Sequence, residues 1–141
     1  MTEVIFTFLE RIGFTHPLHP AIVHLPMGMV MGAVTFRLAS FLPRLKVLAK
    51  TGYHCIILGL FGIPPTVFTG YLDWQQFFAG EWEALIIIKM VLAGVMLILL
   101  SAIAILDDPE QPRPDRNTIL YLVTMLVAIG LGFSGGELIY G

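Results

Sequence analysis

The stretch that opens the first long apolar segment decides how the chain folds, and it reads Thr15-His16-Pro17-Leu18-His19-Pro20-Ala21-Ile22-Val23-His24-Leu25-Pro26-Met27-Gly28. Three of the four histidines of the protein fall within it. Pro20 suits the first turn of a helix, where its missing N–H costs no hydrogen bond. His24 is then about one turn inside this helix, and His16 and His19 precede it. Imidazole rings at the mouth of an apolar helix need polar partners or a bound ligand.

The composition is that of an integral membrane protein. Of the 141 residues, 57% are hydrophobic and 13% are charged, whereas a soluble domain has about 25% charged residues. The net charge of −2 offers no basic surface to a nucleic acid, so we expect no nucleic-acid partner. Cys55 is the only cysteine, which excludes an internal disulfide and a cysteine-based metal site.

Four segments reach the length of roughly 20 apolar residues that crosses a bilayer. They are residues 20–42, 51–74, 83–106 and 118–140. The connections between them are short, so neighbouring helices should run antiparallel. We therefore predict an all-α fold, a four-helix transmembrane bundle in which residues 1–141 form a single integral membrane domain.

The residues before the first segment predict a short N-terminal interfacial amphipathic helix that is retained in the protein. The chain start lacks the basic residues and the small-residue cleavage site of a signal peptide. Glu10 and Arg11 lie away from the apolar face of this helix. That face gathers Val4, Ile5, Phe8, Leu9 and Ile12.

The basic residues of the short loops predict the orientation in the membrane. The first loop carries Arg44, Lys46 and Lys50 without an acid, and residues 107–116 hold two arginines. Residues 73–83 contain three acids and no base. We therefore expect the first and third loops in the cytoplasm and both termini on the outer side of the membrane.

This topology brings polar residues of separate segments to the outer side. Asp73 ends the second segment there, Lys89 lies about two turns into the third, and Glu137 lies near the end of the fourth. A charge at the depth of Lys89 costs about 2.5–3.5 kcal/mol unless it is paired or reaches the surface. We expect an ion pair with Asp73 or Glu137; the alternative is that Lys89 extends to the interface.

The histidines are the candidate ligands of a cofactor. His24, His19 and His16 can supply ligands to a haem iron, although they cannot all serve one iron; otherwise they cap the helix and meet water. The small residues that follow His24 at four-residue steps should form a packing face, which would direct its ring toward the other helices. His54 lies near the opposite side, either as a further ligand or as a packing residue.

Four motifs lie in or beside the first, second and fourth segments: His16-Pro17-Leu18-His19-Pro20, Val23-His24-Leu25-Pro26-Met27-Gly28, Gly70-Tyr71-Leu72-Asp73-Trp74 and Gly135-Gly136-Glu137-Leu138-Ile139-Tyr140. Together they resemble the DUF2231 family, a bacterial family of four-helix membrane proteins. The resemblance implies this fold and a location in the bacterial inner membrane, and it implies no established chemistry. Lys89 stands where the family pattern has a histidine in a His-Ala-Leu-Leu-Asn-like run.

Two main functional hypotheses follow. The first is a cytochrome-b-like, haem-binding electron-transfer subunit or a quinone-associated subunit, with haem b bound by His24 and one of His16 or His19. The alternative is a cofactor-free accessory subunit that packs against a larger membrane complex. A third hypothesis is a proton or ion path through Lys89 and its carboxylates. The expected partners are the lipid bilayer and other membrane subunits or further copies of the chain, and the sequence favours an electron-transfer or accessory subunit over a stand-alone enzyme.

Overall fold

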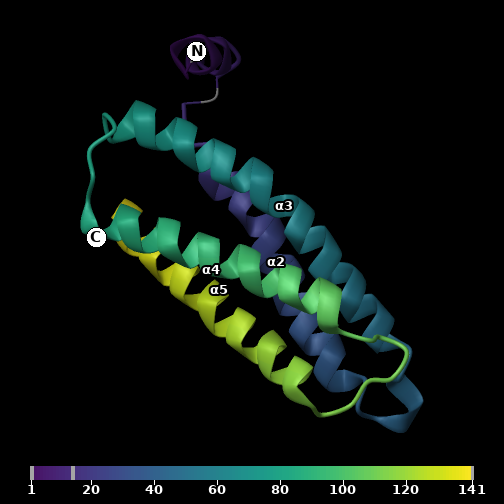
Figure 1. Ribbon diagram of the computed structural model, residues 1–141. Helices are drawn as coiled ribbons and strands as arrows, with labels where there is room; N and C mark the ends of the chain where they lie inside the picture. Colours follow the sequence, from purple (N-terminus) through teal and green to yellow (C-terminus); the bar gives the residue numbers. More distant parts are fainter. Residues whose placement is uncertain (1, 14, 141) are drawn as a thin grey trace.

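The computed structural model describes residues 2–13 and 15–140, with side chains described for residues 4–13 and 15–137. The described chain is all helical, and four of its helices are long and apolar enough to cross a membrane. They run alternately up and down in one bundle (Figure 1), which confirms the predicted fold class. The elements are α1 (Thr2–Arg11), α2 (His19–Ala39), the 3₁₀ turn η1 (Pro43–Leu45), α3 (Leu48–Phe77), α4 (Ala84–Leu106) and α5 (Arg116–Tyr140).

The helices begin or end a few residues away from the predicted bounds. α2 ends at Ala39, three residues before the predicted end, because Pro43 cannot continue the helix and instead starts η1. α3 extends three residues beyond the predicted range at each end and passes through Pro64 and Pro65 without interruption. The Thr66 hydroxyl donates to the Gly62 carbonyl at 2.7 Å beside these prolines.

Small residues of α3 allow it to pack closely on α2. A Cβ atom at Gly52 would lie 3.0 Å from the Ala33 carbonyl oxygen, and one at Gly62 would lie 3.3 Å from the Pro26 ring. α4 packs mainly on α5, and the two helix pairs meet in one apolar core (Figure 1). The buried residues of this core are Val30, Ala33, Val34, Ile56, Ile63, Met96, Leu100, Ile103, Tyr121 and Ala128.

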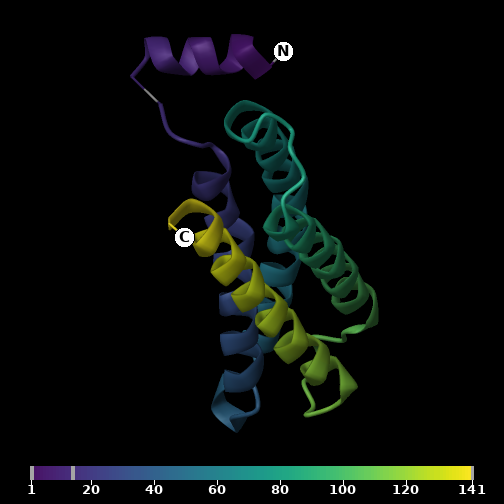
Figure 2. The same cartoon turned by 90° about the vertical axis from the view of Figure 1, so that its left-hand side faces the viewer.

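The two ends of the bundle carry different polar groups. α1 lies across the end at which α2 begins, and α5 ends near it (Figure 2). We call it the His19 end, and we call the end at which α2 stops the Arg37 end. α1 is held by Phe6, which is buried with its ring 5.6 Å from that of Phe77. Phe6 was not in the predicted apolar face, whose member Phe8 is exposed.

Candidate functional site

The His19 end is organised by a carboxylate that caps a neighbouring helix. The first N–H groups of any helix lack partners within the helix, and Leu18 at the start of α2 supplies no side-chain cap. Asp73 of α3 takes this role, since its two oxygens accept hydrogen bonds from the N–H groups of Leu18 at 3.0 Å and His19 at 2.7 Å. Asp73 is only 6% exposed. Its charge also opposes the positive end of the α2 dipole.

His19 is fixed against α3 by a second contact. Its Nδ1 atom lies 3.0 Å from the Thr66 carbonyl oxygen, and a carbonyl accepts only when Nδ1 carries the proton. In the neutral ring this leaves Nε2 as an acceptor for a ligand or a proton. The ring fits because Gly70 has no side chain: a Cβ atom there would lie 3.0 Å from Nδ1. The half-buried His19 is therefore held in one tautomer and orientation.

Lys89 approaches the same region from α4. It lies in the second turn of that helix and is half-buried. A Cβ atom at Gly135 of α5 would lie 3.7 Å from its Nζ atom, which places the ammonium beside α5. Its charge interacts with that of Asp73 and also acts on His19. No direct ion pair of Lys89 is found among the described side chains.

The geometry thus brings three of the expected polar residues together and leaves one apart. His19, Asp73 and Lys89 come from three helices, and we call them the His19–Asp73–Lys89 cluster. The Asp73 oxygens accept backbone N–H groups, and no ion pair joins Asp73 to Lys89, so the ammonium of Lys89 remains available to another acceptor. Glu137 is exposed near the end of α5, and no ion pair joins it to another described residue.

The ring of His24 does not face the other helices, so that expectation was wrong. His24 is exposed, and its Nδ1 atom contacts the carbonyl oxygen of Pro20 one turn earlier. A Cβ atom at Gly28, one turn after His24, would meet nothing, whereas one at Gly32 would lie 3.5 Å from the Cys55 sulfur of α3, so the stripe packs only beyond the level of His24. α2 instead packs through a different face, whose buried residues include Pro26 and Val30.

The other histidines are distributed over the surface of the chain. His16 is exposed before α2. His54 is exposed in the second turn of α3, with its ring 6.4 Å from that of Tyr53. Thr66, the partner of His19, lies twelve residues further along α3, about 18 Å at 1.5 Å per residue. Within the described residues, no group of three or more histidine, cysteine or acidic side chains is arranged to hold a metal ion.

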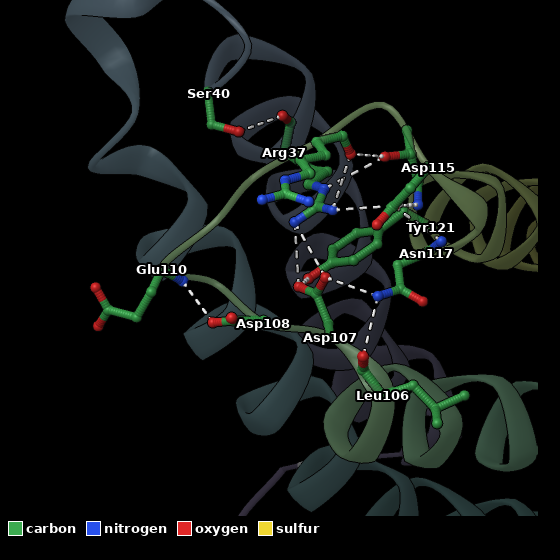
Figure 3. Close-up of polar contacts among 11 residues, drawn as sticks. Arg37, Ser40, Leu106, Asp107, Asp108, Glu110, Asp115, Asn117 and Tyr121 are labelled. Carbon is green, nitrogen blue, oxygen red and sulfur yellow. Dashed lines mark hydrogen bonds and ion pairs between the residues drawn. The ribbon is translucent and has the colours of Figure 1, made fainter.

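The Arg37 end holds a buried ionic cluster that the sequence analysis did not identify (Figure 3). The guanidinium of Arg37 faces Asp107 with an Nη1–Oδ1 distance of 3.1 Å, and both side chains are 1% exposed. It also pairs with Asp115 at 3.4 Å and lies 5.4 Å from the Tyr121 ring centroid. The Tyr121 hydroxyl donates to Asp107 at 2.9 Å. These four residues form the Arg37 cluster.

The Arg37 cluster joins the end of α2 to the connection between α4 and α5. Arg37 donates to the Arg113 carbonyl at 3.3 Å and to the Thr118 hydroxyl at 3.5 Å, while Asn117 donates to the Leu106 carbonyl at 3.0 Å. No buried side-chain nitrogen or oxygen of the described residues lacks a hydrogen-bond partner, and the buried charge of Arg37 is compensated by Asp107. The signal was present in the sequence, because Arg37 lies near the end of the first predicted segment and Asp107 begins the third loop, which are both on the predicted cytoplasmic side.

The comparison with known protein families agrees with the four membrane-length helices of the structure. Residues 15–141 match a family described as a predicted membrane protein, DUF2231. No curated protein matches the chain. No solved structure matches it either. The match covers all four membrane-length helices and both polar clusters, so the chain belongs to the DUF2231 family of membrane proteins.

Proposed function

We propose that this protein is a quinone-associated subunit of a membrane electron-transfer system, with the quinone head group bound at the His19–Asp73–Lys89 cluster. The observation that carries the proposal is the ammonium of Lys89. It is half-buried in a membrane-length helix, and no carboxylate among the described residues contacts it directly. A charge in such a place usually marks a ligand or ion site.

The chemistry of the cluster matches the two oxygens of a quinone or quinol. Lys89 supplies a donor to a carbonyl oxygen, and the Nε2 atom of His19 supplies an acceptor to a quinol hydroxyl. The cluster lies within lipid-facing helices, where a head group on an isoprenoid chain arrives from the bilayer. α5 contributes Gly135 and Gly136 at this level, and a Cβ atom at Gly136 would meet nothing within 4 Å.

Asp73 acts as a positioning residue in this proposal. Its contacts to the Leu18 and His19 N–H groups fix the start of α2 and so the place from which the imidazole extends. The negative charge of Asp73 stabilises the ammonium of Lys89 through space. The N–H groups of the ammonium stay available to a ligand. A ligand oxygen can then bind Lys89 without breaking an existing ion pair.

Haem b is the competing cofactor, and its fit can be judged from the histidines. His19 and His24 are five residues apart, so their side chains leave α2 at directions about 140° apart. His54 lies near the opposite end of α3. Within one chain only His16 is left as a partner for His19 on a single iron. The histidines therefore fit a bis-histidine haem less well than the cluster fits a quinone head group.

The test is the content of the purified protein. We expect quinone to be extracted with the parent protein and to fall about 10- to 100-fold in Lys89→Met, because hydrogen bonds to charged groups contribute about 1.5–3 kcal/mol. His54→Ala is the matched control and should retain the parent content. Quinone retained in full by Lys89→Met would refute the proposal. Reduced-minus-oxidised b-type bands without quinone would favour haem, and a colourless, quinone-free protein would favour the accessory subunit.

A further inference from the structure

The connection between α2 and α3 combines exposed apolar and basic side chains at the Arg37 end. Leu42 is 58% exposed and Val47 is 69% exposed, with Leu45 between them also exposed. Arg44 and Lys46 alternate with these residues and are exposed too. The segment follows the end of α2 and lies beyond the end of the helical bundle (Figure 1).

The loop between α4 and α5 holds four acids, of which three pair with other cations. Asp107 and Asp115 pair with Arg37. Glu110 pairs with Lys50 at 2.6 Å. The fourth, the exposed Asp108, accepts a hydrogen bond from the Glu110 N–H and forms no ion pair with a described residue. Among the described residues, neither basic side chain of the connection forms an ion pair. The connection therefore presents two uncompensated positive charges between three exposed apolar side chains.

We propose that residues 42–47 form a docking surface for anionic phospholipid head groups, distinct from the quinone site at the opposite end. The ends of membrane-length helices lie at the head-group level, so Arg44 and Lys46 are placed to contact lipid phosphates. The apolar side chains beside them insert into the boundary between head groups and acyl chains. An acidic soluble partner would match the two charges but would leave the leucines and Val47 exposed to water.

Lipid selectivity of the reconstituted full chain tests this surface. Spin-labelled phosphatidylglycerol and phosphatidylcholine are added separately to the protein in phosphatidylcholine membranes, and the motionally restricted fraction gives their relative association. We expect the parent to prefer phosphatidylglycerol, with a contribution of up to about fivefold per cation at low salt. The preference should fall as salt is added, because these charges are exposed.

Two variants locate the effect. Arg44→Gln with Lys46→Gln should bring the ratio of the two lipids close to one, whereas Lys50→Gln should leave most of the preference. Lys50 carries the same charge at the same end, and it is already paired with Glu110. The proposal is overturned if the parent shows no preference, if the double variant keeps it, or if Lys50→Gln abolishes it equally. Each single variant, which makes a smaller change in an exposed segment, should lower the ratio partway.

Discussion

Replacing Arg37 by methionine removes the cation from a buried ionic cluster and leaves its anion behind. Asp107 is 1% exposed and would keep only neutral donors, chiefly the Tyr121 hydroxyl at 2.9 Å. Breaking a buried pair by removing one partner costs about 3–5 kcal/mol. The remaining donors to Asp107 place the expected loss in the free energy of unfolding at the lower end, about 3 kcal/mol. Helix content during SDS titration of the protein in mixed micelles measures this loss.

The chain offers two controls for this experiment. Lys50 and Glu110 form an ion pair at the same end with side chains 49% and 67% exposed, so Lys50→Met should cost less than about 1 kcal/mol. Adding Asp107→Asn to Arg37→Met removes the stranded charge and should recover part of the stability, as a double-mutant cycle would show. A loss below about 1 kcal/mol in Arg37→Met would refute the reasoning that the pair is desolvated.

Three further predictions concern the His19 end and the topology. Asp73→Ala removes the cap of α2 and should cost about 1–2 kcal/mol in the same SDS titration, while Asp73→Asn should cost less because one acceptor remains. Gly70→Ala should cost about 1–3 kcal/mol by displacing the imidazole that it faces, whereas Gly94→Ala, with open space around the added carbon, should be neutral. In a cysteine-free background, cysteine at Gln75 should be labelled from outside and cysteine at Lys46 from the cytoplasm; the reverse pattern would contradict the orientation.

The helices were predictable because length and hydropathy alone define a membrane span. The convergence of His19, Asp73 and Lys89 was also predictable, since an up-and-down topology places alternate helix ends at the same level. Neither argument needs the rotation of a helix about its own axis. The predicted ion pair of Lys89 is not found among the described side chains, and Asp73 instead accepts hydrogen bonds from the backbone of α2.

The wrong or missing predictions depend on the rotation of a helix about its own axis or on the path of a loop. His24 was placed on a packing face because glycines follow it, yet α2 packs through Pro26 and Val30 on a different face. A stripe of small residues in the sequence does not predict which neighbouring helix, if any, packs against it. The Arg37 cluster depends on the path of residues 107–115, which returns an aspartate into the bundle. The charge counts predicted that this loop is cytoplasmic, but they could not show that Asp107 turns inward.

Covalent labelling with a photoreactive azidoquinone tests the proposed quinone site most directly. The full chain in phosphatidylcholine membranes is illuminated with the probe, digested and mapped, with and without an excess of an unlabelled short-chain quinone. We predict competed adducts at the start of α2, around Lys89 and at the end of α5, and their loss in Lys89→Met but not in His54→Ala. Adducts confined to the Arg37 end, or adducts that excess quinone does not reduce, would contradict the account.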